Sequence, residues 1–172
     1  GRGQVRAQSK TPSPNGTVNI AGIGVGGKGW EDVNKVKREG NLVAICDADW
    51  GRAKQAMQSM DGVQKFKDFR VMFDTMGKDI DAVTVTTPDH NHAIIALTAM
   101  QLGKHVYCQK PLTYTISEAR ILTEAARKAV VVTQMGNQGH CYDGVRQLCE
   151  MVWNGDIGQV KEVHLWTDRP IW

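Results

Sequence analysis

Several features are scarce or missing in this sequence of 172 residues, and each absence excludes a class of protein. No stretch is apolar for long enough to span a membrane, so no membrane partner is predicted. Lysines and arginines are scattered at a formal net charge of +3, and no basic stripe indicates nucleic-acid binding. None of the four cysteines belongs to a CxxC pair, which leaves a disulfide framework and a zinc site without support.

The composition is typical of one globular domain. Apolar residues make up 41% of the chain and charged residues 23%. The length suffices for one α/β domain with a sizeable core and is too short for two full domains. Cys46 and Cys108 lie inside apolar strand-like runs, where a small buried thiol is the simplest interpretation. Residues 1–16 are polar and rich in Gly, Ser and Pro, and they are predicted to be a disordered lead-in.

From Thr17 onward, strand-like and helix-like segments alternate along the chain. Strands are predicted at 17–23, 41–46, 63–66, 79–86, 104–108, 130–135 and 158–166. Helices are predicted at 27–38, 50–60, 68–76, 90–102, 116–129 and 142–153. Thr115 and Glu118 stand at capping-box spacing before the helix at 116–129. This alternation predicts right-handed βαβ units, and therefore an α/β fold whose parallel sheet is covered by helices on both faces.

A glycine-rich loop follows the first predicted strand and opens the first predicted helix. Its residues are Gly24, Val25, Gly26, Gly27, Lys28 and Gly29. Such a loop lets the backbone approach a pyrophosphate, which then binds the N–H groups at the helix N-terminus. The GxGxxG pattern also fits Gly22, Gly24 and Gly27, but Gly22 then lies within the strand, so Gly24, Gly26 and Gly29 are preferred. A tight strand–helix turn without a ligand is the alternative.

An acidic residue ends the second predicted strand. Asp47 stands 18 residues after Gly29, about where the dinucleotide-binding fingerprint places a carboxylate for the adenosine ribose. Its charge repels a 2′-phosphate, which favours NAD over NADP. Asp49 could be mistaken for it, or could cap the next helix, and Arg52 could stack on adenine, reach a 2′-phosphate or lie in solvent. With the glycine loop, Asp47 predicts a Rossmann-type, doubly wound parallel sheet that binds NAD.

The fourth predicted strand ends in the sequence TTPDHNH, residues 86–92. Pro88 fixes φ and turns the chain sharply. His90 and His92 resemble metal ligands, but no third ligand is near them in the sequence, so no metal is predicted. His92 is interpreted instead as a residue at a helix start near the cofactor.

Two further segments end the fifth and sixth predicted strands. Gln109 and Lys110 follow the fifth, where a lysine can polarise a substrate hydroxyl or pass a proton, unless it is a surface residue before a turn. Asn137 and Gln138 follow the sixth, where neutral amides suit a carboxamide or sugar hydroxyls, unless they serve only the turn. Ligands in open α/β sheets bind beyond these strand ends, so the five segments together predict one cofactor crevice.

These residues resemble the Gfo/Idh/MocA family, named for glucose–fructose oxidoreductase, inositol dehydrogenase and a rhizopine-catabolism protein. The similarity rests on the IGVGGKG loop, the CDAD strand end, TPDHNH, the QKP turn and NGDIG at 154–158. It implies that the glycine loop holds the pyrophosphate and Asp47 the adenosine ribose. It also implies that the nicotinamide side of the site is formed by Thr87, Pro88, His92, Gln109, Lys110, Asn137 and Gln138.

The resemblance also implies a domain organisation. Residues 17–154 would form the dinucleotide-binding domain, and 155–172 would be the truncated start of a C-terminal α+β domain that binds substrate and mediates homo-oligomerisation. The family's Asp-x-x-x-His pair does not follow Gly158, so the catalytic base is expected beyond Trp172. Gln109 stands where the family usually has Glu, which leaves the tuning of Lys110 open.

The function implied is hydride transfer between a nicotinamide cofactor and a secondary alcohol of a small sugar or cyclitol. The alternatives are a redox-neutral, NAD-dependent glycosidase and a non-catalytic NAD-binding fragment. The TPDHNH, QKPLT and GNQGH segments also resemble a subgroup from bacteria that degrade complex glycans. Members of that subgroup often carry a twin-arginine export signal, which implies a periplasmic location; a cytoplasmic one is the alternative.

Overall fold

The computed structural model describes residues 16–166. The chain forms two compact units, the first ending at Gly136 and the second beginning at Asn137. Apart from Gly16, the predicted disordered lead-in lies outside the described residues, and so do residues 167–172. The domain boundary expected after residue 154 stays a prediction.

The first unit is built on a sheet of six parallel strands in the order β3-β2-β1-β4-β5-β6. The strands are β1 (Asn19–Ile23), β2 (Asn41–Cys46), β3 (Gln64–Phe66), β4 (Ala82–Val85), β5 (His105–Gln109) and β6 (Thr133–Gly136). The chain starts at the centre, winds outward to β3, returns beside β1 as β4 and winds outward again. This is the strand order of the Rossmann fold, which confirms the predicted fold class.

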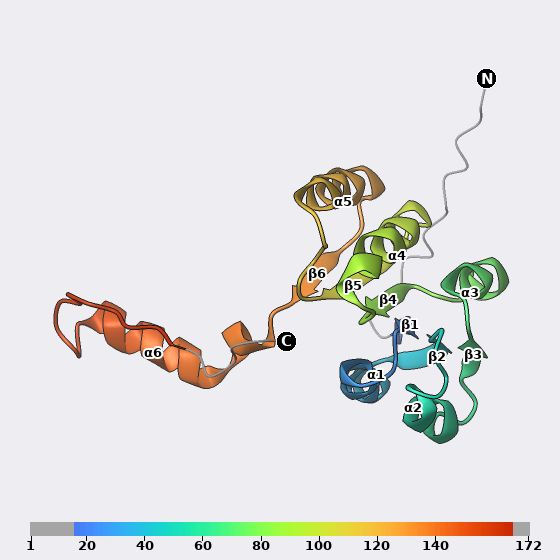
Figure 1. Cartoon of the computed structure of the whole chain (residues 1–172), viewed down its shortest axis with the longest axis horizontal. Helices are drawn as coiled ribbons and strands as arrows, with labels where there is room; N and C mark the ends of the chain where they lie inside the picture. Colours follow the sequence, from blue (N-terminus) through green and yellow to red (C-terminus); the bar gives the residue numbers. More distant parts are fainter. Residues whose placement is uncertain (1–15, 167–172) are drawn as a thin grey trace. The chain divides into compact units, whose positions relative to one another are not determined.

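Helices cover both faces of this sheet (Figure 1). They are α1 (Lys28–Glu39), α2 (Lys54–Ser59), α3 (Phe69–Met76), α4 (Asp89–Gln101) and α5 (Ile116–Ala129). One buried cluster joins α1 and α2 to the sheet, and a second joins α3, α4 and α5 to it. Ala44 belongs to the second cluster and its neighbour Ile45 to the first, because successive strand residues point to opposite faces.

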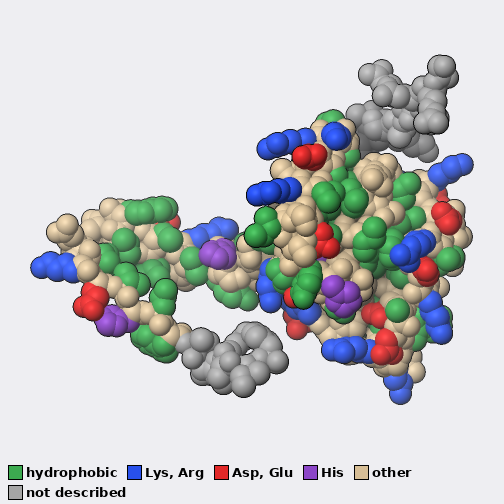
Figure 2. Space-filling view, turned by 45° about the horizontal axis from the view of Figure 1, so that its top comes forward, with side chains coloured by type: hydrophobic (Ala, Val, Ile, Leu, Met, Phe, Trp, Pro, Cys, Tyr) green, Lys and Arg blue, Asp and Glu red, His purple; other side chains and the backbone are tan. Residues whose placement is uncertain are grey.

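Local details of the sequence are confirmed in this unit. Thr115 and Glu118 form the predicted capping box at the start of α5. The thiols of Cys46 and Cys108 are buried, and burial raises the pKa of each to about 12. Charged side chains of both signs are interspersed over the face shown in Figure 2.

The second unit contains a 3-10 helix, η1 (Gln138–Cys141), and the helix α6 (Asp143–Asn154). The strand predicted at 158–166 is wrong, since these residues form no regular element. A strand is maintained by ladder hydrogen bonds to a neighbour, and no strand of the described residues pairs with this segment. None of the helices between residues 16 and 166 combines the length and apolarity needed to cross a membrane.

Candidate functional site

Four of the predicted site segments follow strands that are neighbours in the sheet. The glycine loop follows β1, Asp47 follows β2, the 86–92 segment follows β4, and Lys110 follows β5. Because the strands are parallel, their carboxyl ends meet at one edge of the sheet. We call this edge the carboxyl edge.

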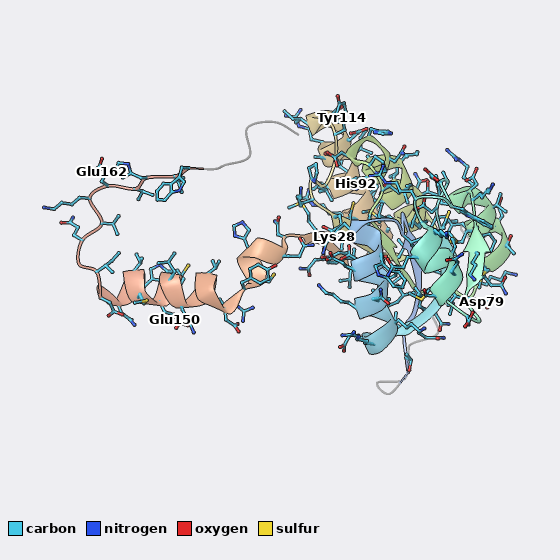
Figure 3. The ribbon with its side chains drawn as sticks, turned by 60° about the horizontal axis from the view of Figure 1, so that its bottom comes forward. Lys28, Asp79, His92, Tyr114, Glu150 and Glu162 are labelled. Carbon is cyan, nitrogen blue, oxygen red and sulfur yellow. The ribbon has the colours of Figure 1, made fainter. Side chains whose placement is uncertain are left out.

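Backbone hydrogen bonds tie these segments together. Gly24 donates to the carbonyl of Cys46 at 2.8 Å, and Thr86 donates to the carbonyl of Ile23 at 2.8 Å. In Figure 3, Lys28 and His92 lie on one side of the first unit, whereas Asp79, which precedes β4, lies on the other. Asn137 and Gln138 belong to the second unit, and their place beside this edge stays a prediction.

Two glycines explain the shape of the loop. Gly24 has a left-handed φ of 78°, and a Cβ on it would lie 2.7 Å from the backbone of Thr86. A Cβ on Gly29 would overlap the carbonyl oxygen of Gly24, so α1 can approach the loop this closely only without a side chain there. Gly22 lies inside β1, which fits the register of Gly24, Gly26 and Gly29.

The first turn of α1 faces outward without a side-chain cap. The N–H groups of Gly29 and Trp30 donate to the loop carbonyls of Gly26 and Gly27, at 3.0 and 3.1 Å, and the helix dipole adds positive potential at this end. Apart from its chain neighbours, no atom of residues 16–166 lies within 4 Å of a Cβ placed on Gly27, so the outer side of the loop is open there. An open, uncapped helix N-terminus behind a glycine loop fits the pyrophosphate of a dinucleotide.

Asp47 binds the glycine loop itself, which the sequence analysis did not foresee. Its Oδ2 accepts from the N–H groups of Val25 at 2.9 Å and Gly26 at 3.1 Å, and its Oδ1 accepts from Asp49 N–H at 2.9 Å. Asp49 plays the separate role of a turn cap, accepting from Arg52 N–H at 3.0 Å. The two neighbouring carboxylates are therefore distinct, and Asp47 is the one that orders the loop.

Lys28 supplies a cation beside the loop. Its Nζ lies 2.6 Å from Glu31 Oε2 and 3.5 Å from Asp32 Oδ1. The hydrogen bond to Glu31 is the main cause that raises the pKa of Lys28 above its usual range. The ammonium is therefore charged at neutral pH, close to the uncapped start of α1.

The turn after β4 contains an unpaired buried hydroxyl. Thr87 Oγ1 is buried and has no hydrogen-bond partner among the described residues. An unpartnered buried polar group costs about 1–3 kcal/mol, so such a group is an available donor and acceptor for a ligand. This fits the predicted place of Thr87 beside the cofactor.

His92 joins two of the predicted segments. Its side chain is buried, with Nδ1 2.6 Å from the carbonyl oxygen of Pro111 and Nε2 2.8 Å from that of Thr87. Each ring nitrogen thus faces a backbone carbonyl oxygen of the turns that follow β4 and β5, and a neutral imidazole donates a hydrogen bond to one of the two. His92 holds these turns together, and its contact with a nicotinamide stays a prediction.

Replacing His92 with leucine should lower the free energy of unfolding by about 1–3 kcal/mol, because the backbone of these turns loses the hydrogen bond that the buried ring donates. The matched control is His90→Leu on the same helix, where the side chain is exposed and the expected change is within about 0.5 kcal/mol. Urea unfolding of both variants measures the difference. Equal stability of the two variants would contradict the bridging role.

A buried carboxylate, that of Asp32, contacts the last residue of β5. Asp32 on α1 accepts from Gln109 Nε2 at 2.6 Å and from Thr86 Oγ1 at 3.1 Å. Lys110 follows Gln109 directly and is exposed. Asp32 was not among the residues predicted for the site; the one available signal in the sequence was a charge next to Val33 on the core-facing side of α1.

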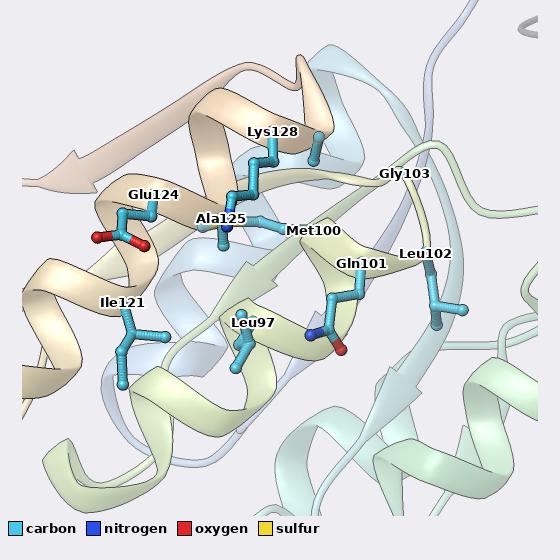
Figure 4. Close-up of a pocket in the computed structure, with 10 residues that line it drawn as sticks. Leu97, Met100, Gln101, Leu102, Gly103, Ile121, Glu124, Ala125 and Lys128 are labelled. Atoms are coloured by element: carbon cyan, nitrogen blue, oxygen red, sulfur yellow. The ribbon is translucent and has the colours of Figure 1, made fainter.

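A groove of the first unit lies elsewhere. Its volume is about 510 Å³, and it is formed by α4 and α5, with Leu97, Met100, Ile121 and Ala125 among its lining residues (Figure 4). It includes Gly103, which precedes β5, so it lies toward the amino ends of the strands. Within 16–166, no three His, Cys, Asp or Glu side chains gather as metal ligands would.

The fold and the glycine loop define a dinucleotide-binding domain of the Rossmann type. Residues 17–137 match the model of the family described as "Oxidoreductase family, NAD-binding Rossmann fold". The chain belongs to this family, Gfo/Idh/MocA, and NAD(P) is the cofactor class of its Rossmann domain.

Similar proteins include several inositol dehydrogenases. Inositol 2-dehydrogenase of Salmonella paratyphi B is 32% identical over 125 residues, which are 72% of this chain and 37% of that protein. The crystal structure of myo-inositol 2-dehydrogenase from Lactobacillus plantarum has a TM-score of 0.75 at 27% identity, covering 84% of this chain and 43% of that one. Scyllo-inositol dehydrogenase from Lactobacillus casei, solved with NAD(H) and scyllo-inositol, has a TM-score of 0.71 at 25% identity, covering 83% and 43%. This chain therefore spans less than half the length of these relatives.

Proposed function

We propose that this chain is the cofactor-binding part of an oxidoreductase that moves hydride between NAD and a secondary alcohol of a cyclitol or sugar. The observation that carries the proposal is the carboxyl edge, where an open glycine loop, an uncapped helix and the unpaired Thr87 hydroxyl lie on neighbouring strands. The inositol dehydrogenases among its relatives support the substrate class.

Each residue at the edge has a role in this proposal. The bound nicotinamide supplies the hydride acceptor. The open start of α1 and the Lys28 ammonium bind the pyrophosphate, and the charge of Asp47 faces the adenosine ribose. Lys110 donates a hydrogen bond to the substrate oxygen and thereby stabilises negative charge that develops on it. A base outside this chain takes the hydroxyl proton.

The cofactor preference is proposed to be NAD, because Asp47 places a fixed negative charge at the end of β2. The chain should bind NADH at least about tenfold more tightly than NADPH, which equals about 1.4 kcal/mol. Asp47→Asn keeps an oxygen that can accept from the loop but removes the charge, and it should reduce this preference. Asp49→Asn is the matched control and should leave the ratio nearly unchanged. Calorimetric titration measures it, and equal ratios for all three proteins would refute the role of Asp47.

The reaction class is tested on a full-length protein that contains this chain. Net formation of NADH with myo-inositol or a related polyol supports the proposal. Cleavage of a glycoside without net NADH would replace it with a redox-neutral glycosidase. Homo-oligomerisation through a second domain and a periplasmic location stay predictions.

A further inference from the structure

The buried side chain of Asp32 connects three elements of the first unit. It projects from α1, whose first residues form the glycine loop, and it accepts from Thr86 after β4 and from Gln109 at the end of β5. The Gln109 side chain is itself buried, at 5% exposure, and its contact with Asp32 is short at 2.6 Å. One carboxylate therefore links the glycine-loop helix to the two strands that carry Thr87 and Lys110.

The chemistry of the contact requires a hydrogen-bond donor at position 109, and the amide supplies it without a charge. A carboxylate only accepts hydrogen bonds, so the group facing it must be a donor, and this orients Gln109 with Nε2 toward Asp32. The opposite end of the amide, Oε1, lies where a Cβ on Gly136 would approach within 2.6 Å. Gln109 is therefore confined on both sides.

A carboxylate at position 109 would face Asp32 at hydrogen-bond distance. Two carboxylates that close cannot both be ionised, so one must hold a proton. Within the described part of the chain, the one cation at ion-pair distance from Asp32 is Lys28, at 3.5 Å, and Lys28 already binds Glu31. This single, shared cation does not neutralise two buried carboxylates.

We propose that Asp32 and Gln109 are a matched carboxylate–amide pair that positions Lys110 relative to the glycine loop. Gln109 precedes Lys110 directly, so an amide held by α1 fixes the backbone from which the lysine side chain extends. Asp32 and Gln109 are thus positioning residues of the cofactor site. This inference rests on the proposed function, because it assigns the pair a role in dinucleotide binding.

The test is a charge swap measured by NADH titration of the chain at pH 8 and pH 5.5. Gln109→Glu should weaken NADH binding about tenfold at pH 8, and much less at pH 5.5, where a shared proton restores the hydrogen bond. The double variant Asp32→Asn with Gln109→Glu reverses the pair and should return the affinity to within about threefold of the parent at both pH values. Gln101→Glu makes the same chemical change at an exposed position of α4 and should have no effect.

Thermal unfolding of the same proteins gives a second, cofactor-independent measurement. In Gln109→Glu the shared proton raises the folded-state pKa of the pair above its unfolded value. The variant should therefore be closest to the parent in stability at pH 5.5 and fall behind as the pH rises. If Gln109→Glu does not fold at pH 8, recovery of folding in the double variant supports the pair.

The results that would contradict the pairing, the positioning role and the proposed function differ from one another. A loss of affinity in Gln109→Glu that is the same at both pH values, or that the double variant does not repair, overturns the proposal. Repaired stability without repaired NADH affinity also overturns the positioning role. A parent chain that does not bind NADH refutes the proposed function, and with it the positioning role, while the unfolding data still decide whether the two residues are paired.

Discussion

Replacing Lys110 with alanine in a full-length protein should lower kcat by about 100- to 1,000-fold, the usual range for loss of a donor that stabilises negative charge developing on a substrate oxygen. Lys110 is exposed at the end of β5, beside the turn that His92 holds to β4. In the proposed function, its ammonium polarises the substrate hydroxyl at the carboxyl edge. Steady-state oxidation of a polyol, followed through NADH formation, measures the loss.

The cofactor should still bind to the Lys110→Ala protein. Dissociation constants for NADH within about threefold of the parent would assign the defect to the chemical step. The control is Lys128→Ala, an exposed lysine on α5 at the groove near the amino ends of the strands, which should keep full activity. A Lys110→Ala enzyme with parental kcat would remove this residue from the mechanism.

The second large effect is expected for Gly29→Ala. The added methyl group would overlap the carbonyl oxygen of Gly24, and relieving that overlap must displace either the loop or α1. NADH binding should fall by about 100-fold or more, and the free energy of unfolding should fall by about 2–4 kcal/mol.

A matched control exists in the second unit. Gly144 is the second residue of α6, as Gly29 is of α1. Outside its own helix and chain neighbours, no described atom lies within 4 Å of a Cβ placed on it. Gly144→Ala should be neutral or slightly stabilising, since alanine favours a helix over glycine by about 1 kcal/mol. Calorimetric NADH titration and urea unfolding of both variants test the contrast. If Gly29→Ala binds NADH as the parent does, the close packing of α1 on the loop is not required.

Sequence reasoning predicted most elements of the fold because their boundaries are marked by local chemistry. The apolar run at 41–46 is β2 itself, and the capping box begins α5 where expected. The predicted starts of two elements were wrong, because local backbone geometry overrides the apolar pattern there. Val130 has a left-handed φ of 55° and ends α5, so β6 begins only at Thr133. The Asp49 cap similarly forms a turn before α2, which starts at Lys54.

The individual segments of the candidate site could be predicted from the sequence. The glycine loop, Asp47 and Lys110 each follow an apolar run, and a parallel sheet brings such ends to one edge. The contacts between segments were not predictable. Asp32 and Gln109 are 77 residues apart, and neither local sequence indicates that the two side chains contact each other. The dual attachment of His92 likewise depends on the packing of two turns.

The space around Gln109 has a consequence for how this protein can diverge. A side chain on Gly136 would collide with Gln109 Oε1 and with the Tyr107 hydroxyl, while Asp32 holds the other end of the amide. A substitution at position 32 or at position 136 therefore acts directly on the Gln109 side chain, which lies between them. These three positions should therefore drift together in evolution, so that a lineage which loses the amide at 109 also changes the acid on α1.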